Sequence, residues 1–165
     1  MNVATFGLVD DINSVYKVKA ATQKEIEWHL MECNNDFIPP LEHRTNIKEY
    51  AQKLYDKTVT FELWINQKLI GLLAAYLNDQ ETFTGYISNV SLLRHFQGKG
   101  RAGRLLDMCI KYAMANNFKT IFLEVSQNKE RAIHLYEKFG FRTFENRNDM
   151  FLMKLEIKDV LQIET

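Results

Sequence analysis

The chain has 165 residues, of which 46% are hydrophobic and 25% charged, an ordinary composition for one globular domain with a sizeable core. The 21 basic and 21 acidic residues give a formal net charge of zero, which excludes a long-range pull toward nucleic acid or an anionic membrane. Because no apolar run reaches the roughly 18 residues that cross a bilayer and the first residues show no signal-peptide pattern, we expect a single cytoplasmic domain over residues 1–165.

The first 13 residues carry no readable pattern, and residues 14–20 alternate as a strand does. Thr22 followed by Glu25 has the form of a capping box and predicts the start of a helix. The apolar side of that helix comprises Ile26, His29, Leu30 and Cys33. Asn34, Asn35 and Asp36 end it, and the adjacent prolines at 39 and 40 mark a rigid break.

A second amphipathic helix is predicted after Asn46, which offers a cap to Glu49. The remaining segments have clear periodicity: strands over 58–65, 69–77 and 82–93, a helix over 102–114, a strand over 120–125, a helix over 132–139 and a closing strand over 151–157. Gly140 is the expected stop of the last helix. This order predicts a mixed sheet with helices on its faces, in which residues 82–125 form a parallel crossover.

The two cysteines, Cys33 and Cys109, lack metal-type spacing, and reduced thiols are the simplest interpretation, although the sequence does not exclude a disulfide. Cys109 lies on an apolar helical stripe and is expected to be a buried structural thiol. His29 shares the apolar face of its helix and is expected in the core. We expect no metal, because the four histidines lack the spacing of metal ligands. They are His29, His43, His95 and His134.

The most informative segment is the run from Gln97 to Gly103, where three glycines and one alanine fall between an apolar strand and an amphipathic helix. Glycine lets a ligand approach the main chain closely. A glycine-rich turn that opens a helix also directs several N–H groups at one point, where the helix dipole favours an anion. The segment therefore predicts a phosphate-binding loop.

Two common phosphate-binding motifs fit the loop poorly. The string G-x-x-x-x-G-K-[ST] of a P-loop does not occur. Residues 98–103 do read G-x-G-x-x-G, and Glu124 follows where a dinucleotide fold places its ribose-binding acid. However, only about 60 residues remain for such a fold, four residues separate strand from glycine, and a hairpin follows Gly140. An NAD-binding enzyme is therefore the weaker alternative.

A third interpretation uses more of the chain. Residues 97–102 read Q-x-x-G-x-A, residues 123–125 read L-E-V, and residues 132–141 read A-x-x-L-Y-x-K-x-G-F. Together these strings resemble the GNAT superfamily of acyl-CoA N-acyltransferases over about residues 82–157. The resemblance implies an α/β (α+β) fold, with a mixed, largely antiparallel twisted sheet, a central parallel splayed strand pair and helices on both faces. It also implies that residues 20–57 form the wall of the acceptor site and residues 82–157 the CoA-binding half.

The same resemblance implies acetyl-CoA as co-substrate. Its pyrophosphate is expected on the loop amides, its pantetheine arm on the backbone of the preceding strand, and a further contact at Asn128, unless Lys129 takes that place. The implied cofactor-binding residues are Val90, Ser91, Leu92, Gln97, Gly98, Lys99, Gly100, Arg101, Ala102, Gly103, Arg104 and Asn128. For the basic residues Arg94, Lys99, Arg101 and Arg104, the alternative is a solvated surface charge.

Two residues are implied to be catalytic. Tyr136 takes the position of the tyrosine that protonates the departing thiolate in the family, although its periodicity alone fits a core aromatic. Glu124 takes the position of a glutamate that helps to deprotonate the amine in some relatives, with a structural carboxylate as the alternative. No covalent acyl-enzyme is indicated.

The resemblance thus implies an N-acetyltransferase that moves an acetyl group from acetyl-CoA to a primary amine by direct attack. The acceptor is expected to be a small molecule, with an amino sugar as a lead. The loop 34–44 with Phe37 is expected to contact it, with a plain connector as the equal alternative. A non-catalytic CoA-binding regulatory module is the alternative from another class. We expect neither a nucleic acid nor a membrane as partner, and a homodimer is left open.

Overall fold

The computed structural model describes residues 13–158; residues 1–12, for which the sequence has no readable pattern, lie outside the described part. The first half contains β1 (Ser14–Val18), α2 (Gln23–Glu32), η1 (Asn34–Asp36), α3 (Leu41–Arg44), α4 (Ile47–Lys57), β2 (Val59–Ile65) and β3 (Lys68–Tyr76). The second half contains β4 (Thr84–Leu92), η2 (Arg94–Phe96), α5 (Arg101–Ala115), β5 (Thr120–Ser126), α6 (Glu130–Lys138), β6 (Arg142–Arg147) and β7 (Met150–Glu156). The predicted order of strands and long helices is confirmed.

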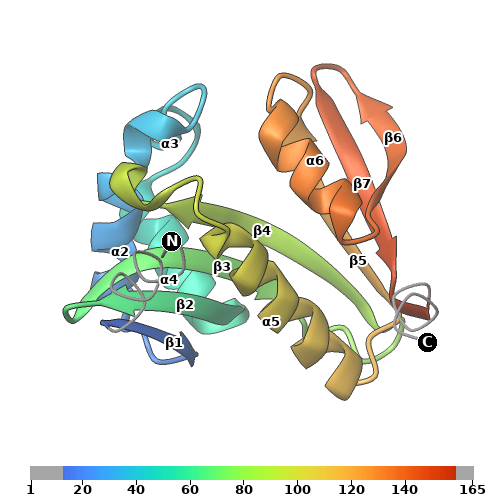
Figure 1. Cartoon of the computed structure of the whole chain (residues 1–165), viewed down its shortest axis with the longest axis horizontal. Coiled ribbons are helices and arrows are strands. Elements are labelled where there is room, and N and C mark those ends of the chain that lie inside the picture. Colours follow the sequence, from blue (N-terminus) through green and yellow to red (C-terminus); the bar gives the residue numbers. More distant parts are fainter. Residues whose placement is uncertain (1–12, 159–165) are drawn as a thin grey trace, which may run out of the picture.

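The described strands form one seven-stranded sheet in the order β1-β2-β3-β4-β5-β7-β6 (Figure 1). Its neighbouring strands run antiparallel except for β4 and β5, which are parallel and joined by α5. The predicted mixed sheet with one parallel crossover is therefore confirmed. A doubly wound dinucleotide fold, which needs a mostly parallel sheet, is excluded by this topology.

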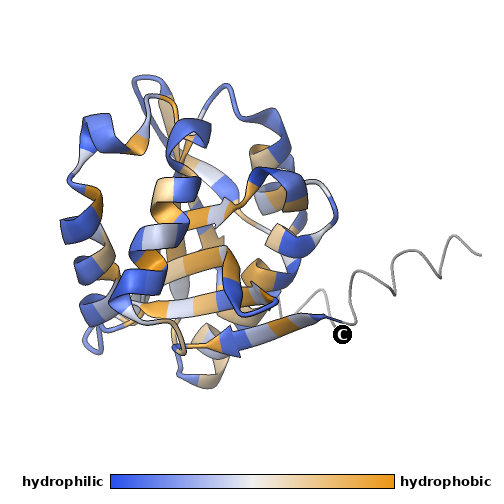
Figure 2. Cartoon of the chain, turned by 90° about the vertical axis from the view of Figure 1, so that its left-hand side faces the viewer, coloured by the Kyte–Doolittle hydropathy of each residue, from blue (hydrophilic) through white to orange (hydrophobic). Residues whose placement is uncertain are grey.

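Helices cover both faces of the sheet and bury two apolar clusters (Figures 1 and 2). On one face, Leu105, Leu106 and Cys109 of α5 pack on Phe61 and Leu63 of β2. On the opposite face, the cluster comprises residues of α2, α4 and the strands, among them Ile26, Leu30, Leu54, Leu69 and Leu72. Successive side chains of a strand point to opposite faces of the sheet, so a single strand such as β2 contributes to both clusters. No helix of residues 13–158 is long and apolar enough to cross a membrane.

The predicted caps set the helix bounds. Thr22 Oγ1 accepts the amide of Glu25, whose carboxylate accepts the amide of Thr22, so both halves of the capping box form. Asn46 accepts the amide of Glu49 at the start of α4. Gly140 follows α6 with φ at 104°, the left-handed conformation expected of a helix stop. Asn34–Asp36 does not merely end α2: it forms a further 3-10 turn, η1.

A buried carboxylate joins the start of the chain to the sheet. Glu62 of β2 is 0% exposed and accepts hydrogen bonds from four donors: the amides of Ala20 and Ala21, Thr60 Oγ1 at 2.6 Å and Trp64 Nε1 at 2.9 Å. These donors satisfy the carboxylate, which offsets the cost of its burial. The connection from β1 to α2 is therefore held by one side chain.

Replacing Glu62 with alanine is expected to lower the free energy of unfolding by about 3 kcal/mol or more, because four donors lose their acceptor inside the protein. The matched control is Glu145→Ala, which removes an exposed glutamate from β6 and should cost less than about 1 kcal/mol. Urea denaturation measures both. A loss for Glu62→Ala no larger than that of the control contradicts the role assigned to Glu62.

Candidate active site

Strands β4 and β5 separate near the middle of the sheet. Their ladder stops at the pair Ile87–Leu123. Just beyond it, the register of β4 with β3 shifts, so that Ser88 is an extra, bulged residue between Ile87 and Asn89. Bulges bend a strand and increase its twist. The rest of β4 still pairs with β3 on one side, so its opposite edge faces the gap between the two strands, which confirms the splayed strand pair.

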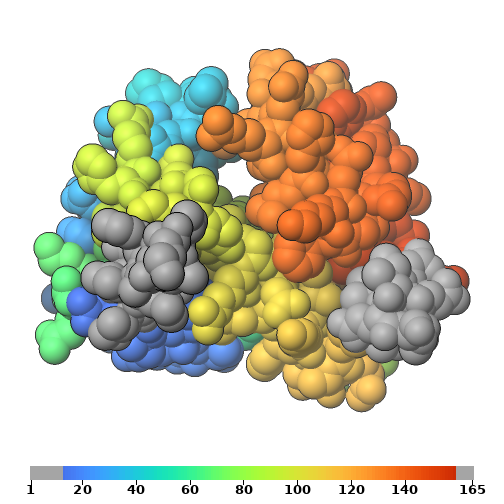
Figure 3. All heavy atoms as spheres, viewed as in Figure 1, coloured from blue at the N-terminus to red at the C-terminus, as the bar shows by residue number. Residues whose placement is uncertain are grey.

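A cleft of about 890 Å³ lies over this gap. It is bounded by the end of β4, by the turn that opens α5, by the first turns of α6 and by the segment after α2; Figure 3 shows the hollow between the α5 and α6 segments. The predicted site residues that line it are Val90, Ser91, Leu92, Gln97, Gly98, Gly100, Arg101, Ala102, Gly103, Asn128 and Tyr136. Lys99, Arg104 and Glu124 are not among the lining residues, whereas Lys129 is.

The glycine turn leaves its main chain accessible to a ligand. Gly98 and Gly100 have φ of 81° and 77°, and a Cβ built on either meets no atom within 4 Å. Gly100 is the N-cap of α5 and supplies no side-chain hydrogen bond to the first turn, and the residues of this turn line the cleft. The amides of a first helical turn suit a diphosphate. A Cβ on Gly103 would stand 3.4 Å from Leu135, so α5 and α6 pack against each other at this residue.

The basic residues of this turn differ in their surroundings. Arg101 is only 7% exposed; its Nη1 donates to the carbonyl of Phe96 at 3.2 Å and its guanidinium lies 5.5 Å from the Phe96 ring centroid. The interpretation of Arg101 as a solvated surface charge is therefore wrong, because Phe96 of the preceding 3-10 turn covers it. Arg104 is exposed, with its guanidinium 4.0 Å from the ring centroid of Tyr16.

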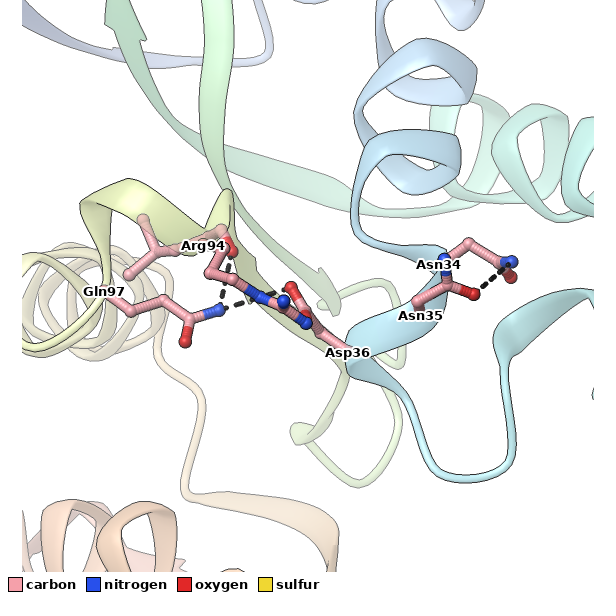
Figure 4. A network of polar contacts seen from close by, with 6 residues as sticks. Asn34, Asn35, Asp36, Arg94 and Gln97 are labelled. Carbon is pink, nitrogen blue, oxygen red and sulfur yellow. Dashed lines mark hydrogen bonds and ion pairs between the residues drawn. The ribbon is translucent and has the colours of Figure 1, made fainter.

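Asp36 connects the segment after α2 to the glycine turn (Figure 4). Its carboxylate accepts from Arg94 Nη2 at 2.8 Å and from Gln97 Nε2 at 3.5 Å. Gln97 Nε2 also donates to the carbonyl of Leu92 at 3.0 Å, so the Gln97 side chain binds the end of β4. The sequence assigns Asp36 only to a helix end, because contacts between distant segments leave no local pattern.

His29 is buried, as expected, but it also supports the cleft wall. Its Nδ1 lies 2.8 Å from the carbonyl of Leu69, which can only accept, so Nδ1 carries the hydrogen. Its Nε2 lies 2.8 Å from Ser91 Oγ, and Asn89 Nδ2 donates to the same oxygen at 2.8 Å. Burial lowers the pKa of His29 to about 4, so the ring is neutral and the Ser91 hydroxyl donates to it. The position of Ser91 in the cleft is thereby fixed.

Stability is expected to fall on acidification through His29. Its folded-state pKa of about 4 lies below the ordinary value of 6.5, so the unfolded chain binds the proton first as the pH drops. The contribution of neutral His29 to the free energy of unfolding is complete above about pH 6.5, and it decreases by about 3 kcal/mol as the pH falls to about 4. Unfolding of His29→Gln in urea across this range should lack that slope, whereas the exposed His43→Gln should retain it. Equal slopes in all three proteins contradict this assignment.

Neither cysteine has the properties of a nucleophile. Cys33 lines the cleft, and burial, followed by the charge of Asp36, raises the pKa of its thiol to about 12. Burial also raises the pKa of Cys109, which is 0% exposed. Both cysteines are free thiols, and both are protonated at neutral pH. Residues 13–158 contain no group of three or more histidine, cysteine or acidic side chains that could hold a metal ion.

Tyr136 lies on α6 where that helix borders the cleft. It is 8% exposed and packs edge-on against Phe141, with ring centroids 5.9 Å apart. Burial raises the pKa of its hydroxyl to about 12, so the group keeps its proton through the neutral range. The site and core interpretations of Tyr136 are thus compatible: the ring packs in the core and the residue borders the cleft.

Glu124 is the first residue of β5 beyond the last pair with β4. Its side chain, 33% exposed, forms an ion pair with Arg147 of β6, with Oε1 2.9 Å from Nη1. Hydrogen bonds to Glu124 and Glu145 raise the pKa of Arg147. The carboxylate therefore lies at the point where the strands part, outside the residues that line the cleft.

Comparison with known proteins agrees with this geometry. A model of the acetyltransferase (GNAT) family matches residues 24–141, and the chain belongs to that family. Two solved structures share its fold. The ribosomal-protein-S18-alanine N-acetyltransferase of Escherichia coli has a TM-score of 0.69 and 20% identity, over 87% of this chain and 94% of its own. The PaiA N-acetyltransferase of Thermoplasma acidophilum, in complex with coenzyme A, has a TM-score of 0.68 and 14% identity, over 86% and 99%.

Curated relatives match a shorter segment. N-acetylaspartate synthetase of Danio rerio is 33% identical over 85 residues, 52% of this chain and 30% of its own length. The probable spermine N(1)-acetyltransferase of Bacillus subtilis subsp. natto is 29% identical over 93 residues, 56% of this chain and 60% of its own. The chain spans 30% to 60% of the length of the curated relatives it matches.

Proposed function

We propose that the chain transfers an acetyl group from acetyl-CoA to a primary amine of a small molecule. The observation that carries this proposal is one cleft that joins a glycine turn, a free strand edge and a buried tyrosine. The turn amides of residues 98–103 bind the pyrophosphate, and the open edge of β4 at residues 90–92 pairs with the amide groups of the pantetheine arm, as an added strand pairs with a sheet. Asn128 and Lys129 border the arm from the side of α6.

The reaction is a direct attack without an acyl-enzyme. The nitrogen lone pair of the neutral amine forms a bond to the thioester carbonyl carbon, and the carbon–sulfur bond breaks. The electron pair stays on sulfur, and Tyr136 gives its proton to the departing thiolate. The raised pKa of Tyr136 keeps this proton available at neutral pH. The amide product and free CoA then leave.

The amine must lose one proton before or during the attack. Glu124 is the proposed acceptor of that proton, because its carboxylate lies where β4 and β5 part. Its ion pair with Arg147 holds the carboxylate in place. In this proposal Tyr136 of α6 donates a proton and Glu124 of β5 accepts one.

The proposed acceptor is a small amine, and amino sugars belong to this class. The proposed wall of the acceptor site is the segment between α2 and α4, which supplies Phe37 and Asp36 to the cleft. The names of the relatives refer to different amines: aspartate in one, spermine in another. In this proposal the wall residues of each member select its acceptor.

The test is release of CoA thiol from acetyl-CoA with a panel of primary amines, together with thermal unfolding in the presence of acetyl-CoA or NAD. We expect amine-dependent thiol release, and stabilisation by acetyl-CoA but not by NAD. Stabilisation by acetyl-CoA without turnover on any amine indicates a non-catalytic CoA-binding module instead. Stabilisation by NAD alone contradicts the proposal altogether.

A further inference from the structure

Side chains of α2 and α4 hold the part of β4 that has lost its partner β5. Beyond Ile87, β4 pairs only with β3 among the described strands. His29 of α2 lies 2.8 Å from Ser91 Oγ. Tyr50 of α4 lies 2.7 Å from Ser88 Oγ, at the other end of the same segment. Helix side chains therefore anchor β4 at both ends of the stretch where a second strand is missing.

The contact of Tyr50 engages both polar groups of the bulged residue. Its hydroxyl donates to the carbonyl of Ser88 at 3.2 Å and also contacts Ser88 Oγ. A phenol has one hydrogen, so both contacts form when Ser88 Oγ donates to the phenol oxygen. Burial raises the pKa of Tyr50, which keeps the phenol in the protonated form that this arrangement needs. One side chain thus holds the backbone and the hydroxyl of Ser88.

The bulge lies at the same level of the sheet as the proposed base. The last ladder pair of β4 and β5 is Ile87–Leu123, and the next residues of the two strands are Ser88 and Glu124. Ile87 and Leu123 both belong to the cluster under α5. Because side chains alternate along a strand, Ser88 and Glu124 point to the opposite face, which α4 covers beside Ser88. They flank the start of the gap.

The acyl end of the cofactor reaches this level in the proposed binding mode. The pyrophosphate lies on the turn 98–103, and the pantetheine amides pair with residues 90–92. The thioester then lies further along β4, toward Ser88, which is two residues or roughly 7 Å from Val90. Neither Tyr50 nor Ser88 is among the residues that line the cleft. Tyr50 therefore acts on the reacting end through β4 and not by touching the cofactor.

We propose that Tyr50 is a positioning residue: by holding Ser88 it fixes the bend of β4 at the bulge, and with it the position of the thioester relative to Glu124. The inference rests on the proposed acetyl transfer. A bulge bends its strand and aims the groups beside it, so its geometry decides where the free edge presents the thioester. A misplacement of about 1 Å at a reacting centre can cost on the order of 100-fold in rate.

The first experiment is Tyr50→Phe, which removes the hydroxyl and keeps the ring that packs on the cluster of α2 and α4. The probes are acetyl-CoA and whichever of glucosamine, spermidine and glycinamide the parent protein uses fastest. We expect kcat to fall at least about 10-fold, while the KM of each substrate and the calorimetric Kd of acetyl-CoA change less than about 2-fold. Tyr55→Phe, which alters an exposed tyrosine of the same helix, should keep the parent kcat.

A double-mutant cycle tests whether Tyr50 acts through Ser88. Ser88→Ala removes Oγ and leaves the carbonyl in place, so kcat should fall at least about 3-fold. The double variant should be no slower than Tyr50→Phe alone, because both substitutions break the same link. Ser88→Thr keeps a hydroxyl and should recover most of the rate that Ser88→Ala loses.

The outcomes separate this inference from the acetyl transfer itself. Thiol release by the parent protein together with an unchanged kcat in Tyr50→Phe overturns the positioning role and leaves the proposed function standing. A raised KM for the amine at unchanged kcat shows that Tyr50 contacts the acceptor, and rate losses that multiply in the double variant show that Tyr50 acts independently of Ser88; each overturns the inference. No thiol release by the parent with any amine overturns both proposals. If thermal unfolding shows that Tyr50→Phe is misfolded, the comparison of Ser88→Ala with Ser88→Thr decides.

Discussion

Replacing Tyr136 with phenylalanine is expected to lower kcat about 100-fold or more while the affinity for acetyl-CoA stays the same. In the proposed reaction the hydroxyl proton is needed only when the thiolate departs, so its loss affects the transition state and not the bound cofactor. The ring remains, and with it the packing against Phe141. Steady-state kinetics gives kcat, and calorimetry gives the affinity for the cofactor.

Tyr112→Phe is the matched control. Tyr112 is a partly buried tyrosine on α5 that packs edge-on against Phe61, and it is not a lining residue of the cleft. This variant should keep wild-type kcat. If Tyr136→Phe turns over as fast as the parent protein, Tyr136 is not the acid; if it loses affinity for acetyl-CoA in proportion to its loss of rate, the hydroxyl acts in binding.

Replacing Gly100 with alanine is expected to weaken acetyl-CoA binding by at least 10-fold. The residue has φ of 77°, which an alanine adopts at a cost of about 1 kcal/mol, and the new methyl group points into open space at the cleft mouth. In the proposed binding mode the diphosphate approaches the main chain through that space, so the methyl group blocks a ligand and not a protein neighbour. Calorimetry on the folded variant measures the loss.

Gly140→Ala separates the steric effect from backbone strain. Gly140 also has a positive φ, 104°, and its Cβ would meet Leu155 at 3.1 Å, so the substitution should destabilise the fold at least as much. Since Gly140 lies after α6 and is not a lining residue, acetyl-CoA affinity should be unchanged. Equal losses of affinity in the two variants mean that strain, and not contact with the ligand, explains the effect at Gly100.

Local patterns predicted the elements well. The Thr22–Glu25 box, the Asn46 cap and Gly140 are short-range signals, and each lies where the structure begins or ends a helix. The glycine turn was recognisable for the same reason, because two glycines close together in the sequence, Gly98 and Gly100, adopt its positive φ values. The parallel pairing of β4 with β5 also followed, since the helix between these strands indicates a parallel crossover, whereas the position of β7 between β5 and β6 was not predicted.

Contacts between distant segments were not predictable in this way. The hydrogen bonds of His29 with Ser91, and of Asp36 with Gln97, depend on where α2 meets β4 and the turn. Likewise, the burial of Arg101 depends on Phe96 lying over it, which spacing alone does not reveal. The bulge at Ser88 left only one weak signal, two polar residues in succession within an apolar strand.

A loop that binds its ligand through peptide amides affects how far the sequences of related proteins can diverge. Every residue type except proline supplies the same N–H, so in the proposed binding mode only the few glycines that shape the turn are under constraint from the cofactor. The neighbouring side chains are free to drift over generations without loss of the shared chemistry. Such a loop is compatible with a common architecture at TM-scores of 0.64 to 0.70 alongside sequence identities of 14% to 21%.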